Sequence, residues 1–148
     1  MRSILVISLL SCFFAAYEAK IFPRCELAKK LKAQGLDGYQ GYSLANWVCL
    51  ADHESSYNTK AFNGKNSDGS SDYGIFQLNN RWWCTDSKYP SAHGCNMACS
   101  KFLDDNIDDD IACAKRVVKD PNGISAWVGW VKHCKGKDLS KYLAGCNL

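Results

Sequence analysis

Apolar residues recur at intervals of three and four in four parts of the chain, a spacing typical of helices that bury one face. The first predicted helix has Pro23 in its opening turn and Gly35 just past its end, as each residue's backbone preference favours. Ser43 is the expected cap of the second helix, which runs from residue 44 to about 55. Glu54 lies near the end of that helix, on or beside its apolar face.

Two more helices are expected in the C-terminal half. Three aspartates lead the third helix at residues 108–110 and basic residues close it, an order that the helix dipole favours. Pro121 and Gly123 mark its end. A short turn around residues 139–143 follows the fourth. The apolar positions of the fourth helix are Ile124, Trp127, Val128 and Val131.

Turn residues replace the helical pattern between residues 59 and 79. Asn63-Gly64 and Asp68-Gly69 precede a short apolar run at 73–78, which predicts an antiparallel sheet of two or three strands. Residues 82–99 are rich in cysteine and show no periodicity. The fold class is therefore α+β, with helices before and after a small sheet.

Composition narrows the class of protein. The chain has 148 residues, of which 47% are hydrophobic and 22% charged, as in one compact domain. A net charge of +3 is too small for a protein that binds nucleic acid specifically. This net charge is also small for a protein that attacks membranes through a cationic surface. We expect a monomer.

The N-terminus indicates export. Arg2 precedes an apolar run at residues 4–16, which is shorter than the about 20 residues needed to cross a bilayer. The pattern is that of a secretory signal peptide rather than a membrane anchor. Cleavage after Ala19 would leave residues 20–148 as an extracellular domain.

Cysteine is the most informative residue type. The sequence has nine cysteines, and Cys12 is lost with the signal peptide. Zinc is disfavoured because the three histidines lack ligand spacing and only two cysteines lie close together. An even number in an exported chain predicts four disulfides, although the count leaves roughly 100 pairings open. The cysteines are Cys25, Cys49, Cys84, Cys95, Cys99, Cys113, Cys134 and Cys146.

Two carboxyl groups in unlike surroundings suggest a pair of catalytic acids. Glu54 lies on an apolar helix face, whereas Asp72 lies in a polar strand. Glycoside hydrolysis needs one carboxylic acid that stays protonated and one carboxylate that stays ionised. Spacing alone fits two surface acids equally well, so the surrounding motifs matter.

Those motifs resemble one family closely. They are the stretches 41–49, 68–79, 81–84 and 125–127, together with all eight cysteines of residues 20–148. On these residues the chain resembles the C-type lysozymes over essentially all of 20–148. The resemblance implies a lysozyme-like α+β fold with a helical domain and a small antiparallel sheet. It also implies a secreted muramidase that cleaves the β-1,4 bond between N-acetylmuramic acid and N-acetylglucosamine of bacterial peptidoglycan, with retention.

The resemblance assigns roles to single residues. Glu54 matches the general acid, and Asp72 matches the nucleophile or electrostatic stabiliser. Trp127 is expected to form a wall that desolvates Glu54. The substrate-binding positions are Trp82, Trp83, Trp127, Asn63, Gln77, Asn79 and Asp120. The implied disulfides are Cys25–Cys146, Cys49–Cys134, Cys84–Cys99 and Cys95–Cys113.

An acidic run adds a candidate metal site. Residues 104–110 carry five aspartates, which is typical either of a solvated helix start or of a calcium site. The loop lacks the glycine and glutamate of an EF-hand. It resembles instead the calcium elbow of alpha-lactalbumin and the calcium-binding lysozymes, which implies one structural Ca²⁺ and no organic cofactor. The implied ligands are the side chains of Asp104, Asp109 and Asp110 and the backbone carbonyls of Lys101 and Asn106.

One rival function uses the same fold. Alpha-lactalbumin modifies a sugar transferase without hydrolysing sugars, so a non-catalytic regulatory protein is the alternative. The calcium loop does not separate the two, but the presence of both Glu54 and Asp72 favours the enzyme.

Overall fold

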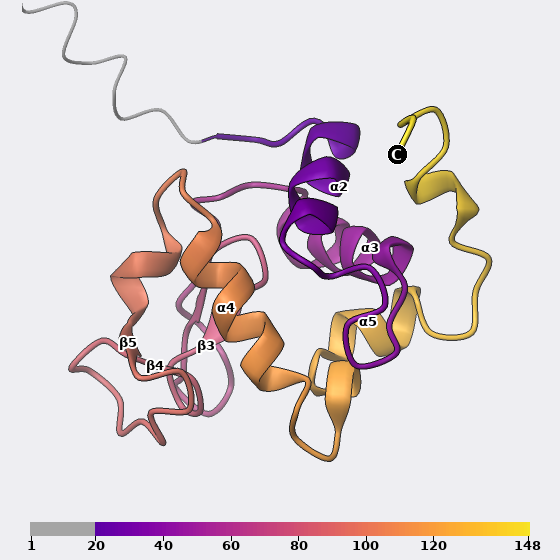
Figure 1. Cartoon of the computed structure of the whole chain (residues 1–148). Coiled ribbons are helices and arrows are strands. Elements are labelled where there is room, and N and C mark those ends of the chain that lie inside the picture. The colour runs from indigo at the N-terminus through magenta and orange to yellow at the C-terminus, as the bar shows by residue number, and fades with distance from the viewer. Residues whose placement is uncertain (1–19) are drawn as a thin grey trace, which may run out of the picture.

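Helices make up one half of the molecule, and the other half consists of loops with short strands and a helix alongside them (Figure 1). The computed structural model describes residues 20–148, and the expected signal peptide at 1–19 lies outside the described residues. Helices α2 (Arg24–Ala33), α3 (Leu44–Ser55) and α5 (Val128–His133) gather beside the C-terminal segment. Helix α4 (Asp108–Val117) runs alongside the strands. No helix of residues 20–148 is long and apolar enough to cross a membrane.

The sheet is antiparallel, as predicted, and has three strands. Strand β1 (Phe62–Asn63) pairs with β2 (Asp72–Tyr73), which pairs with β3 (Leu78–Asn79). In this register Asp72 lies opposite Asn63 on one side and Asn79 on the other. The sheet therefore places amide side chains beside Asp72.

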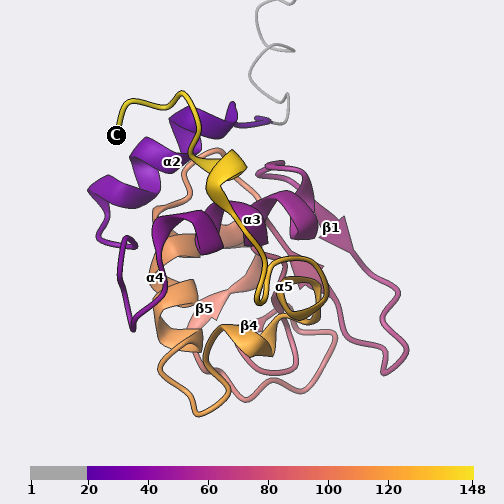
Figure 2. The ribbon, with the colours of Figure 1, turned by 90° about the vertical axis from the view of Figure 1, so that its right-hand side faces the viewer.

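The cysteine-rich segment contains a short pairing that the sequence did not predict. Strands β4 (Cys84–Thr85) and β5 (Met97–Ala98) run parallel to one another (Figure 2). A disulfide joins Cys84 to Cys99 next to this pair, so the covalent link holds together strands too short to carry a periodic pattern. Three 3₁₀ helices complete the described structure, at Cys99–Phe102, Gly123–Ala126 and Ser140–Tyr142.

Two helix boundaries differ from the prediction. Helix α2 begins at Arg24, so Pro23 is its cap rather than part of its first turn. The predicted fourth helix is wrong in its first half, because Ile124 lies in a 3₁₀ helix and Trp127 has an extended backbone before α5 begins. Val128 and Val131 are 63% and 39% exposed, so they do not form the buried face that the spacing predicted.

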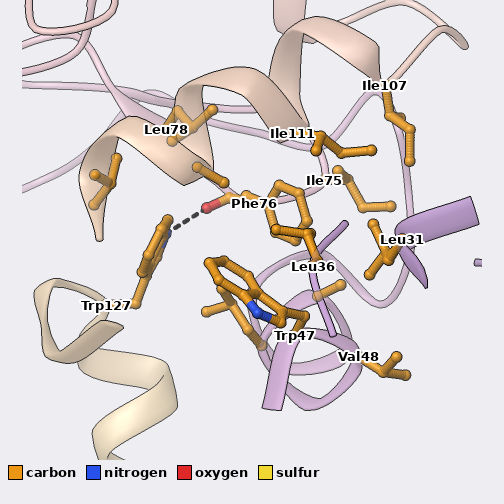
Figure 3. Close-up of a cluster of buried hydrophobic side chains, with 14 of the residues drawn as sticks. Leu31, Leu36, Trp47, Val48, Ile75, Phe76, Leu78, Ile107, Ile111 and Trp127 are labelled. Carbon is orange, nitrogen blue, oxygen red and sulfur yellow. Dashed lines mark hydrogen bonds between the residues drawn. The ribbon is translucent and has the colours of Figure 1, made fainter. Parts of the chain in front are cut away.

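Trp127 explains this break in the helix. Its indole N–H donates a hydrogen bond of 2.7 Å to the backbone oxygen of Phe76, and the ring is buried in the core (Figure 3). The extended backbone at Trp127 turns the ring inward toward Trp47. Trp47 and Trp130 are buried, as expected for core residues.

Four disulfides link the described chain. They are the pairs that the family resemblance implies: Cys25–Cys146, Cys49–Cys134, Cys84–Cys99 and Cys95–Cys113. The first spans 121 residues of sequence and the second joins α3 to the end of α5. They add to an apolar core that is large enough to support a domain of this size.

Candidate active site

A cleft of about 780 Å³ receives residues from both halves of the molecule. Glu54 reaches it from α3, Asp72 and Asn79 from the sheet, and Trp127 from the segment before α5. The cleft therefore brings the two predicted catalytic carboxyl groups onto the walls of one cavity.

Glu54 lies in the last turn of α3, which ends when Ser56 takes a left-handed conformation (φ 52°). The side chain is largely buried, and this burial, with a smaller contribution from the charge of Asp72, raises the pKa of Glu54 to about 7. Gly129 comes close to the carboxyl group, since a Cβ at this position would lie 2.2 Å from Oε2. Such a group keeps its proton up to about neutral pH, where an ordinary glutamate has lost it, and can donate it.

Asp72 lines the same cleft in a polar setting. Its Oδ1 accepts a hydrogen bond of 2.8 Å from Asn79 Nδ2, and its Oδ2 accepts one of 3.0 Å from Asn66 Nδ2. Each carboxylate oxygen thus has an amide donor, an arrangement that suits a negative charge. Asn66 was not predicted from the sequence, because it lies in an irregular turn where no periodicity indicates the direction of its side chain.

The three predicted cleft tryptophans all line the cavity, in different ways. Trp82 is 51% exposed, and the guanidinium of Arg81 lies 4.7 Å above its ring. Trp83 is partly buried and packs against the core, whereas Trp127 is buried. An exposed indole offers an apolar face to the C–H face of a sugar, and Trp82 is placed to do so.

The predicted polar residues separate into two groups. Gln77, Asn79 and Asp120 line the cleft, and Asp120 pairs with Arg116 at 2.7 Å. Asn63 lies on the exposed strand β1, outside this lining, and its Nδ2 donates a hydrogen bond to Oδ1 of Asn66, which does line the cleft. The lining also includes polar residues that were not predicted from the sequence, which are Asn66, Asp68, Arg116 and Asn122.

The acidic loop contains one aspartate of unusual character. Asp110 is fully buried, and neither of its carboxyl oxygens has a hydrogen-bond partner. Burial raises the pKa of Asp110 to about 8, and the charges of Asp104 and Asp109 raise it further, against an opposing effect of the nearby backbone N–H groups of Asp110 and Ile75. A buried carboxyl group with two unused oxygens is costly unless a cation compensates it, so the loop fits a calcium ion.

Two other residues of the acidic loop, Asn106 and Asp108, lie at the surface. Asp108 points outward, where its Oδ1 accepts from Lys30 Nζ at 2.9 Å and from Gln34 Nε2 at 2.7 Å. The side-chain oxygen of Asn106 accepts a hydrogen bond of 3.0 Å from the backbone N–H of Asp108.

Comparison with known proteins identifies the family. The C-type lysozyme/alpha-lactalbumin family profile matches residues 20–146. The chain belongs to the C-type lysozyme/alpha-lactalbumin family. Within this family it is 76% identical over 129 residues to the milk isozyme of lysozyme C from Canis lupus familiaris, covering 87% of this chain and all of that protein. The milk isozyme from Equus caballus is 70% identical over the same length and coverage.

A solved structure in the family has the same fold. Canine milk lysozyme in its holo-type form aligns with a TM-score of 0.84 at 76% identity, covering 87% of this chain and 99% of that one. The lysozyme-like fold expected from the sequence is therefore confirmed.

Proposed function

We propose that this protein is a secreted lysozyme, a glycoside hydrolase that cleaves the β-1,4 bond between N-acetylmuramic acid and N-acetylglucosamine in bacterial peptidoglycan. The observation that carries the proposal is the pair Glu54 and Asp72, which share one cleft but have opposite environments. The relatives named lysozyme C support the same activity.

The two carboxyl groups divide the work in the established manner of lysozymes. Glu54 donates its proton to the glycosidic oxygen as the bond to the anomeric carbon breaks. Asp72 faces the positive charge that develops on the sugar ring and stabilises it or forms a covalent bond to C1. Glu54, now ionised, then takes a proton from the water that attacks C1. Two displacements on one carbon retain the anomeric configuration.

The polar donors around Asp72 matter for this role. Asn66 and Asn79 fix both carboxylate oxygens, so Asp72 does not need to reorient when charge develops on the sugar. Trp82 gives the sugar an exposed aromatic surface at the cleft edge. A non-catalytic regulatory role, the alternative from sequence, is not favoured because this complete arrangement would have no use in it.

The direct test is the lysis of bacterial cell walls, which is measured as a fall in the turbidity of the suspension. Glu54→Gln keeps the shape of the side chain but has no acidic proton, so we expect lysis to fall by about 10² to 10⁴. Glu26→Gln is the matched control, because Glu26 is an exposed glutamate paired with Lys20 on the surface. Comparable lysis by Glu54→Gln and the wild type would overturn the assignment.

We further propose that the acidic loop binds one structural Ca²⁺. Asp104, Asp109 and Asp110 would supply carboxylate oxygens, and Lys101 and Asn106 would supply backbone carbonyls. The two unpartnered oxygens of Asp110 support this most strongly. The existence of a holo-type form of canine milk lysozyme is consistent with it.

Melting curves with and without Ca²⁺ test the proposal. Binding to the native state stabilises by roughly 4 kcal/mol at a thousandfold excess over Kd, so Ca²⁺ should raise the Tm and a chelator should lower it. Asp110→Asn should remove this response. Asp108→Asn, a neighbour whose side chain faces Lys30, should keep it. An unchanged calcium response in Asp110→Asn would contradict the site.

Export with an antibacterial role completes the proposal. The apolar N-terminus of the sequence supports a signal peptide, and four disulfides are typical of proteins that fold in oxidising compartments. When the protein is expressed in a secretory cell, N-terminal sequencing of the protein recovered from the culture medium should show a chain that begins at Lys20. Retention in the cell with an intact N-terminus would contradict export.

A further inference from the structure

Two histidines stack on the helical half of the molecule, away from the cleft. The rings of His53 and His133 have centroids 4.3 Å apart and planes only 7° from parallel. His53 comes from α3 and His133 from the last position of α5, and both residues are exposed. Neither lines the catalytic cleft.

A disulfide fixes the backbone on both sides of this pair. Cys49 lies one helical turn before His53, Cys134 directly follows His133, and the two cysteines are joined with a Cα–Cα distance of 6.1 Å. Ligand atoms of Cys49, His53 and Cys134 lie within 4.8 Å of one another, but both sulfurs are already bonded and are not thiolates. The disulfide therefore holds the two imidazoles close together, and its bonded sulfurs do not themselves act as thiolate ligands.

A hydrogen-bond chain sets the tautomer of His53. The hydroxyl of Tyr142 donates to Asp52 Oδ2 at 3.0 Å, which leaves the hydroxyl oxygen to accept from His53 Nε2–H at 3.1 Å. With its proton on Nε2, His53 has a free lone pair on Nδ1. Carboxylates that hold the far nitrogen of a histidine in this way are a regular feature of metal-binding imidazoles.

The charges around His53 favour the neutral ring. Burial lowers its pKa most, and the positive groups of His133, Lys141 and Lys137 lower it further, against an opposing effect of Asp52. The ring nitrogens of His133 have no hydrogen-bond partner within residues 20–148. The surroundings thus hold His53 toward its neutral, metal-binding form.

We propose that His53 and His133 form a two-imidazole surface site for a divalent transition-metal cation of the Zn²⁺ or Cu²⁺ class. The χ2 torsion of histidine is soft, so each ring can turn one nitrogen toward a shared ion. Water completes the coordination sphere on this exposed face. Imidazole nitrogen prefers these cations over Ca²⁺ and Mg²⁺, so the site is separate in chemistry from the acidic loop.

Calorimetric titration with Zn²⁺, in excess Ca²⁺ and slightly above neutral pH, tests this site. The wild type should show one Zn²⁺ site, and His53→Gln and His133→Gln should each weaken it by well over tenfold. His93→Gln is the matched control, because His93 is an exposed histidine whose ring stacks on no other aromatic ring of residues 20–148. Tyr142→Phe, which removes the hydroxyl that orients His53, should weaken binding by about tenfold.

NMR with traces of Cu²⁺ gives a second readout that does not depend on affinity. The ring C–H signals of His53 and His133 should broaden together, and those of His93 should persist. Near-native melting curves in chelator show that each variant is folded. Full Zn²⁺ affinity in either single variant, or equal broadening of all three histidines, would overturn the shared site.

Discussion

Replacing Glu54 by glutamine should stabilise the protein at neutral and alkaline pH, because the acid that serves catalysis weakens the fold. The pKa of Glu54 is raised to about 7 in the folded protein, from an ordinary value of 4.5. Below the ordinary value both the folded and the unfolded chain bind the proton, so the shift costs nothing. As pH rises from 4.5 to about 7, the unfolded chain releases its proton first, and the free energy of unfolding falls.

The size of the effect follows from this interval. One pH unit corresponds to about 1.4 kcal/mol, so the full interval is worth roughly 3 kcal/mol. The carboxyl group keeps some contact with solvent in the open cleft, which reduces the expected effect to about 2 kcal/mol. Glutamine carries no charge at any pH and avoids this loss.

Denaturant unfolding near pH 4, 6 and 8 measures the difference between Glu54→Gln and the wild type, with the slope of the transition compared at each pH. We expect almost no difference near pH 4 and a gain of about 2 kcal/mol for the variant near pH 8. Glu26→Gln should show no such gain, because Glu26 is exposed beside Lys20. A gain that does not grow with pH, or a variant that becomes less stable than the wild type as pH rises, would refute the reasoning.

Three further outcomes follow from the same cleft. Asp72→Asn should slow wall lysis by on the order of a hundredfold, because the charge facing the sugar is lost; near-normal lysis would contradict its role. The rate of lysis should fall as pH rises through about 7, where Glu54 loses its proton, and a rate still rising well above that pH would contradict a protonated acid. Trp82→Ala should weaken binding of chitin oligosaccharides with little change in Tm, whereas Trp127→Ala should cost about 3 to 5 kcal/mol of stability; equal effects on Tm would show that Trp82 is also a core residue.

The spacing of apolar residues predicted a helix correctly where one face of that helix is buried along most of its length. Helix α3 begins and ends where its apolar positions predict, because one face of it is buried along most of its length. The fourth helix failed for a physical reason. The backbone turns at Trp127 so that its indole can donate to the oxygen of Phe76, and local spacing carries no signal of a partner that is 51 residues away.

The candidate active site likewise has features that the sequence predicted and features that it did not. The contrast between Glu54 and Asp72 was visible in the sequence, because one has apolar helix neighbours and the other polar strand neighbours. The role of Asn66 was not visible, since it depends on how a turn folds back onto β2. The pairing of His53 with His133 was equally hidden, because it arises from the contact of two helices far apart in the sequence.

The disulfide between Cys25 and Cys146 also has a mechanical consequence. The ends of the described chain meet at this bond, and Arg24 adds hydrogen bonds to the backbone oxygens of Tyr142 and Ala144. A pulling force applied at the two ends would therefore pass through the sulfur bridge and leave the core unloaded. A single cut in a surface loop would likewise produce two fragments that stay joined. The covalent frame of residues 25–146 is therefore a closed ring, which resists both stretching from its ends and a single break in a loop.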